Sequence, residues 1–175
     1  MNHNLVDPLI SIGALADKVG LSVSAIRKYE VAGLIIPHRT RSGHRMFSYE
    51  DITRIRVIQH MIKELGFNAE GIRRLQALLP CWDLLPCKKK VRDECQAFKD
   101  NSKPCWMMND AHCTLQGNEC RDCIVYRFGS LCIEDIKELL YNQSKDFDPK
   151  KAITDYLDRT HYNENIKDSK KKEKK

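Results

Sequence analysis

The sequence predicts a mainly α-helical protein, with a winged helix-turn-helix domain at residues 10–79, a small irregular Cys-rich module at residues 80–129 and short helices at residues 130–160. Three observations support this fold class. Up to Leu79, apolar residues recur at helical spacing behind Ser and Asn residues that can cap helices. One short polar hairpin pattern interrupts these helices. Beyond Leu79 the helical spacing fails, and all eight cysteines follow.

Two short helices are expected at the start of the domain. Ser11 can cap a helix over about residues 12–19. Ser22 can cap a second helix over about residues 23–31, which Gly33 ends. Two helices joined by a short turn that contains Gly are typical of a helix-turn-helix.

A small hairpin, or wing, is expected next. Two short runs of apolar or mixed character, at residues 34–36 and 45–47, flank a polar segment. Ser42 and Gly43 lie in the middle of that segment and are typical turn residues. We therefore place the tip of the wing at these two residues.

Two further helices complete the domain. Ser48 can cap the first, and Asp51 stands three residues on, as in a capping box. Gly66 ends this helix, and Asn68 can cap another that runs to about Leu79. Four residues around the start of the longer helix are expected in the core: Phe47, Tyr49, Ile52 and Ile55.

Basic residues gather near the wing, although the net charge of +6 is modest. No acidic residue lies between Val31 and Tyr49. Arg39, Arg41 and Arg45 fall close together in this stretch. A local basic cluster of this kind is typical of a phosphate-binding surface.

Short hydroxyls and cationic side chains on the second helix and the wing are the candidate DNA contacts. Hydroxyls fit against phosphates or base edges, and an Arg side chain can pair bidentately with guanine. Tyr29 could stack on or hydrogen-bond to DNA, and could equally belong to the core. The candidate residues are Ser22, Ser24, Arg27, Lys28, Tyr29, Arg39, Arg41, His44 and Arg45.

Several motifs of this region occur together and in order. Gly20-Leu-Ser-Val-Ser-Ala-Ile-Arg-Lys-Tyr-Glu30 precedes Gly33-Leu34-Ile35 and the wing stretch Arg39-x-Arg-Ser-Gly-His-Arg-Met-Phe-Ser48. Ser11-Ile-Gly-Ala-Leu-Ala16 comes before them, and Tyr49-x-Asp51 comes after. This combination resembles the MerR family of transcriptional regulators, over about a third of the chain.

The resemblance implies sequence-specific binding to double-stranded operator DNA, a homodimer, and RNA polymerase at the promoter as a further partner. Members of the family usually continue from the winged domain into a long dimerisation helix. Here Pro80 interrupts the helical pattern at that point. The candidate dimerisation helices are therefore the short ones at residues 130–160, and residues 161–175 are expected to form a disordered charged tail.

The chain contains no apolar run near the roughly 18 residues that a transmembrane helix needs. Its N-terminus has no basic region that leads into an apolar segment, so we expect no secretory signal and no membrane partner. A cytoplasmic location follows as an expectation. Structural disulfides are rare in that reducing compartment, so clustered cysteines favour metal binding or redox chemistry.

The Cys-rich region contains an imperfect duplication. Pro80-Cys-Trp82 and Pro104-Cys-Trp106 are the same tripeptide, and each half also contains the pattern Cys-x-x-aromatic. The repeat resembles the small modules called two-CW domains. Its two tryptophans are expected to shield the sulfur atoms or simply to pack in a core. Cys132 lies beyond the repeat and is expected to be a plain buried thiol.

Thiolate ligands with irregular gaps suit an iron–sulfur cluster or a thiolate-rich zinc site. Only Cys120 and Cys123 have the two-residue gap of a metal knuckle, so a simple zinc finger fits poorly. His112 is a further candidate ligand, and the lysine run after Cys87 could lower the pKa of that thiol. The candidate metal ligands are Cys81, Cys87, Cys95, Cys105, Cys113, Cys120 and Cys123.

These patterns together predict a DNA-binding transcriptional regulator whose Cys-rich module senses metal or redox state. Two alternatives keep the DNA-binding domain but make the cysteines purely structural, or a disulfide switch. No paired acid–base residues and no nucleotide-binding Gly loop are visible, so an enzyme is not expected.

Overall fold

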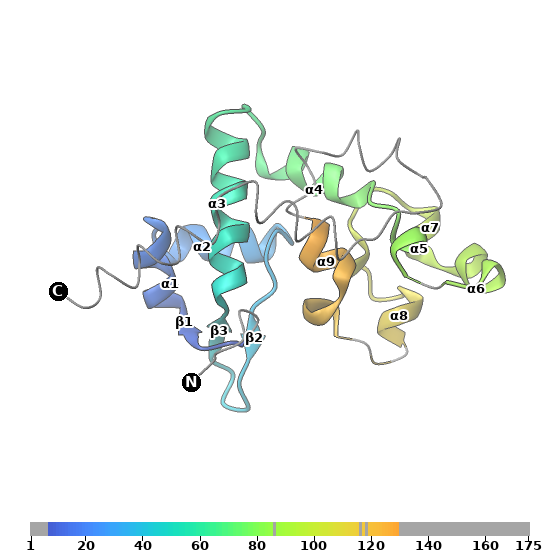
Figure 1. The fold of residues 1–175 in the computed structure, drawn as a ribbon, viewed down its shortest axis with the longest axis horizontal. Helices are drawn as coiled ribbons and strands as arrows, with labels where there is room; N and C mark the ends of the chain where they lie inside the picture. The colour runs from blue at the N-terminus through green and yellow to red at the C-terminus, as the bar shows by residue number, and fades with distance from the viewer. Residues whose placement is uncertain (1–6, 86, 116, 118, 130–175) are drawn as a thin grey trace. The chain divides into compact units, whose positions relative to one another are not determined.

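The computed structural model describes residues 7–85, 87–115, 117 and 119–129, all within one compact unit, Met1–Ser130 (Figure 1). The helices predicted at 130–160, the tail predicted at 161–175 and Cys132 lie outside the described residues. The structure is mostly helical with a small sheet, which confirms the predicted fold class.

The helix-turn-helix forms as predicted. Helix α1 spans Ile12–Val19, and the side chain of its N-cap Ser11 accepts a hydrogen bond from the amide of Ala14. Helix α2 spans Val23–Val31, with Ser22 as its N-cap. At the end of α1, Gly20 has a φ of 65°, a left-handed conformation that lets the chain turn sharply into α2.

The wing is a β-hairpin within a three-stranded antiparallel sheet of order β1-β3-β2. The strands are β1 Ile10–Ser11, β2 His38–Arg39 and β3 Arg45–Phe47. Figure 1 shows the loop between β2 and β3 projecting from the rest of the domain. The first strand of the hairpin, β2, begins at His38 and not at the predicted residues 34–36. Leu34 and Ile35 are instead fully buried in the core.

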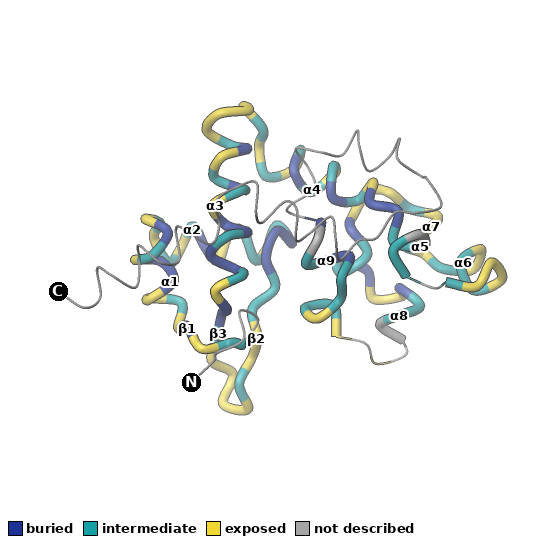
Figure 2. The backbone as a smooth tube through the Cα atoms, viewed as in Figure 1, coloured by how far each residue is buried: buried dark blue, intermediate teal, exposed yellow. Residues whose placement is uncertain are grey.

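Helix α3, Tyr49–Lys63, is the centre of the domain. The predicted capping box is present, since Ser48 and Asp51 each bond the other's backbone amide. Ile55 and Met61 lie along its buried face, which Figure 2 shows as dark blue positions on α3. Helix α4, Ala69–Ala77, follows with the predicted cap, Asn68.

Three of the four residues expected in the core near α3 are buried: Phe47, Ile52 and Ile55. The prediction for Tyr49 was wrong, because this side chain is 37% exposed. Tyr49 is the first residue of α3, and its ring lies 5.9 Å from the ammonium group of Lys18. An aromatic ring there can cover part of the helix end while it remains in contact with water.

The Cys-rich module consists of short helices and turns. They are α5 Cys81–Leu84, α6 Lys89–Glu94, α7 Gln96–Lys99, η1 Cys105–Met107, α8 His112–Leu115, η2 Cys120–Asp122 and α9 Ile124–Gly129. Its packing relies on aromatic edges: the rings of Trp82 and Phe98 are 4.9 Å apart, and those of Trp106 and Tyr126 are 5.3 Å apart. Both pairs are T-shaped, an arrangement that places the positive edge of one ring on the face of the other.

None of the helices in the described part of the chain is both long and apolar enough to cross a lipid bilayer.

Candidate DNA interface and thiol region

Helix α2 presents a polar face. Ile26, which is fully buried, anchors the opposite side of the helix in the core. Ser22, Ser24, Arg27 and Lys28 are all exposed, and the hydroxyls of the two serines lie 2.9 Å apart. The four predicted contacts on the first turns of α2 are therefore accessible to a ligand.

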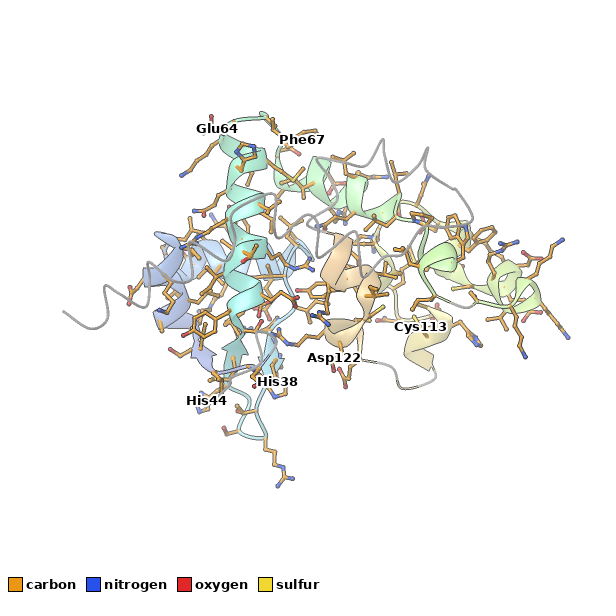
Figure 3. The ribbon with its side chains drawn as sticks, in the orientation of Figure 1. His38, His44, Glu64, Phe67, Cys113 and Asp122 are labelled. Atoms are coloured by element: carbon orange, nitrogen blue, oxygen red, sulfur yellow. The ribbon has the colours of Figure 1, made fainter. Side chains whose placement is uncertain are left out.

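The wing carries the second group of predicted contacts. Arg41 and His44 are exposed, and Figure 3 shows His44 on the hairpin. The turn between the strands is fixed locally, because Thr40 bonds the backbone of His44 through both its amide and its hydroxyl. The wing tip thus presents the cationic side chain of Arg41 on a turn of defined conformation.

Glu30 joins helix α2 to the wing. Its two carboxylate oxygens accept hydrogen bonds from Arg39 at 2.8 Å and from Arg45 at 2.6 Å. The hydrogen bond to Glu30 raises the pKa of Arg45. Each guanidinium has five N–H donors, so both arginines keep donors for a phosphate while Glu30 orients them.

Tyr29 was predicted to be either a DNA contact or a core residue, and its environment is intermediate between the two. The residue is partly buried, and this burial raises the pKa of its phenol. A tyrosine phenol is protonated at neutral pH in any case, so its hydroxyl can donate a hydrogen bond. Of the nine predicted DNA contacts, seven are exposed, and Tyr29 and Arg45 are partly buried. Contact with DNA itself stays a prediction for all nine.

Several thiols of the module lie close enough to influence one another. A hydrogen bond with Cys81, together with burial, raises the pKa of Cys105, and the thiols of Cys123 and Cys113 add to this shift. Burial raises the pKa of Cys120 to about 11, with further contributions from Cys113 and Cys123. None of the seven described cysteines is in a disulfide.

Cys87 and Cys95 lie at the margin of this group. Burial is the main cause that raises the pKa of Cys87, followed by the nearby thiols of Cys81 and Cys95. The lysine run therefore does not lower the pKa of Cys87, because Lys88 to Lys90 are exposed to solvent. His112 contacts the group through its backbone, since its amide donates to the sulfur of Cys95 at 3.5 Å.

The thiols do not form an assembled metal site in this conformation. Within the residues that the structure describes, no three His, Cys, Asp or Glu side chains are placed so that they could hold a metal ion. A metal centre at the predicted ligands stays a prediction.

Comparisons with known proteins agree with the N-terminal geometry. Residues 10–79 match the model of the MerR HTH family of regulatory proteins. The mercuric resistance operon regulatory protein of Bacillus cereus is 46% identical over 65 residues, which are 37% of this chain and 48% of that protein. Residues 10–79 are a MerR-type helix-turn-helix domain.

Two other relatives match the MerR domain. The regulator HmrR of Rhizobium leguminosarum bv. viciae is 38% identical over 69 residues, 39% of this chain and 53% of that protein. The regulator GlnR of Bacillus anthracis is 35% identical over 68 residues, 39% of this chain and 52% of that protein. All three relatives are named as regulators and none as an enzyme, and the chain spans about half the length of each.

Sequence reasoning missed the residues that join the MerR domain to the Cys-rich module. The indole of Trp106 donates to the carbonyl oxygen of Gly33 at 2.7 Å, so this tryptophan bridges the two regions rather than only shielding sulfur. Arg127 forms a bidentate ion pair with Glu50, at 3.0 and 2.9 Å. Arg54, which is buried, donates to the carbonyl oxygen of Tyr126.

These bridging residues had one signal in the sequence. Trp106 directly follows Cys105 in the repeat, and Tyr126 is the aromatic residue of the second Cys-x-x-aromatic pattern. The repeat therefore marked them as special, but nothing in it indicated that their partners lie in the MerR domain. That assignment requires the three-dimensional contacts.

Proposed function

We propose that this chain is a transcriptional regulator that binds double-stranded operator DNA through α2 and the wing. The observation that carries the proposal is the exposed basic and hydroxyl surface on these two elements, which Glu30 holds together through Arg39 and Arg45. The relatives, which are named as regulators, support the same conclusion. A cytoplasmic homodimer that acts with RNA polymerase at a promoter completes the proposal.

A phosphate contact has a measurable consequence in salt. Each neutralised phosphate contributes about 0.9 to the slope of log affinity against log salt concentration. Arg41→Ala should therefore lower the slope by about one and weaken binding to every duplex to a similar degree. The probe is a duplex enriched by the full chain from a random-sequence pool. Arg92→Ala, on α6 of the module, is the matched control.

The outcomes of this experiment separate clearly. An unchanged slope for Arg41→Ala would remove the wing from the interface. Equal losses for Arg41→Ala and Arg92→Ala would indicate general electrostatic attraction rather than a defined surface. Absence of duplex binding by the wild-type chain at low salt would refute the function.

We further propose that the Cys-rich module adjusts DNA binding in response to metal or redox state. Thiols that lie close enough to shift one another's pKa support this role, and one relative is named for a mercuric resistance operon. The donor chemistry suits zinc or an iron–sulfur cluster. Binding would require the thiols to lose their protons and to converge further than they do in this conformation.

In one alternative the cysteines are purely structural. Metal content and the absorption spectrum of protein purified without oxygen distinguish the two. Iron with sulfide, or stoichiometric zinc, would support a bound centre. Metal-free protein whose DNA affinity is also insensitive to a thiol oxidant would leave the structural role.

A further inference from the structure

The guanidinium of Arg121 lies where the two ends of the wing meet. Its Nη1 donates to the carbonyl oxygen of Ile36 at 2.6 Å, and its Nη2 donates to Asp51 Oδ2 at 2.7 Å. Ile36 comes just before strand β2, and Asp51 belongs to the capping box that follows strand β3. One side chain of the Cys-rich module therefore contacts both ends of the hairpin.

The end of the wing that leads from β3 into α3 depends on Asp51 Oδ2. Asp51 Oδ2 also accepts from the amide of Ser48 at 2.7 Å and from its hydroxyl at 2.9 Å. The side chains of Arg121 and Asp51 are 12% and 4% exposed. Water has little access to this pair, so removal of one partner leaves the other charge without compensation.

The other end of the wing, at Ile36, is held by a second residue of the module. The amide of Ile36 donates to the hydroxyl of Tyr126 at 2.7 Å, so both polar backbone groups of Ile36 bond to the module. Tyr126 is in turn fixed by Arg54, whose guanidinium lies 3.6 Å from the centre of its ring. Partly buried backbone groups require partners, and here the module supplies them.

We propose that the Cys-rich module is an intramolecular brace that positions the wing for DNA, with Arg121 as the positioning residue. The proposal rests on the DNA-binding function proposed above. Arg121 lies between Cys120 and Cys123, and Tyr126 follows Cys123 by three residues. A change in the conformation of this turn would therefore act directly on both ends of the wing.

The first test compares two arginines that both pair with the first turn of α3. Arg121→Met removes the contacts with both ends of the wing. Arg127→Met removes an ion pair to Glu50 and leaves both ends in place. Arg121→Met should weaken duplex binding by about tenfold, within the range typical of coupling between two sites. Arg127→Met should weaken it by less than about twofold.

Amide hydrogen exchange provides a readout that does not depend on DNA. Residues 38–47 should exchange faster in Arg121→Met and at the wild-type rate in Arg127→Met, because only the first variant releases the wing. Arg121→Lys keeps the charge but not the paired donors, so its affinity and exchange should lie between those of wild type and Arg121→Met.

A double variant then separates positioning from simple loss of stability. In an Arg41→Ala background the wing already contacts DNA less well, so Arg121→Met should cost less than about threefold there. Full additivity of the two effects would overturn the proposal. Wild-type exchange of residues 38–47 in Arg121→Met would overturn it as well.

Tyr126→Phe covers the case in which Arg121→Met does not fold. It removes only the hydroxyl that accepts from Ile36 and keeps the ring against Arg54. We expect about threefold weaker binding and faster exchange at the start of the wing. Wild-type behaviour of Tyr126→Phe and Arg121→Lys would refute the brace. Failure of the wild-type chain to bind any duplex would refute the proposed function instead.

Discussion

The MerR domain and the Cys-rich module obtain their structure from different sources. Each helix of the domain is capped by a side chain next to it in sequence: Ser11, Ser22, Ser48 and Asn68. In the described part of the module, α5, α6, α7, η1 and η2 have no side-chain cap. Most fully buried apolar side chains also lie in the domain. The domain therefore encodes its fold locally, whereas the module depends on distant contacts.

Two methionines offer the largest expected difference between the regions. Met61 on α3 is fully buried, and Met108 after η1 is 8% exposed. Met61→Ala should lower the free energy of unfolding by about 3 kcal/mol, because the surrounding helices cannot close the cavity. Met108→Ala should cost only about 2 kcal/mol, the low end of the usual range, because short turns can collapse around the gap.

Urea unfolding followed by two probes measures both effects. Circular dichroism reports mainly on the helices, and tryptophan fluorescence reports on the module, which contains both tryptophans, Trp82 and Trp106. Coincident transitions in the wild-type chain would show that the two regions unfold together. Equal costs for the two methionine variants would contradict the view that the module is the more adaptable region.

The contrast explains what the sequence could predict. Ser48 and Asp51 are three residues apart, so their capping box was visible as a pattern, and Phe47 and Ile55 followed from helical and strand spacing. The exposure of Tyr49 could not be predicted, because spacing alone does not show which part of a helix end is covered. Local rules were therefore sufficient for most of the MerR domain.

The candidate site was predictable only in part. The basic residues of α2 and the wing were visible as a cluster, but their organiser, Glu30, is brought to Arg39 and Arg45 by the fold. Arg121 and Asp51 are 70 positions apart in the sequence. A single sequence contains no rule that pairs residues at this separation, so the contacts of the module with the wing had to come from the structure.

The thiols give a second, smaller difference between the regions, which depends on pH. The ordinary pKa of a Cys thiol is 9.0, and burial raises that of Cys120 to about 11. A thiol with a higher pKa in the folded than in the unfolded chain holds its proton more tightly when folded. Its contribution to stability is therefore complete below about pH 9 and is lost as the pH rises through about 11.

We expect the fluorescence-detected unfolding midpoint to fall between about pH 8 and about pH 10.5. Other groups titrate in this range, so the control is Cys120→Ala, which should show a shallower fall. Burial also raises the pKa of Cys87 and contributes to the raised pKa of Cys105, so part of the dependence should remain in that variant. Identical pH profiles for wild type and Cys120→Ala would contradict the assignment of this effect to Cys120.

Helix caps give the smallest effects and the sharpest test of local encoding. The side chain of Asn68 accepts from the amide of Gly71 at 2.7 Å, and Asn68→Ala should cost about 1 kcal/mol. Lys88 occupies the equivalent N-cap position of α6 with extended backbone, φ −65° and ψ 140°, but provides no cap. Lys88→Ser should therefore stabilise the chain by about 0.5 kcal/mol. An increase in the free energy of unfolding from this one local hydrogen bond would show that side-chain caps can stabilise the helices of the module as they do in the MerR domain. If Lys88→Ser has no effect while Asn68→Ala costs the expected amount, helix formation in the module is limited by its distant contacts alone. In that case local caps stabilise the helices of the MerR domain but not those of the module.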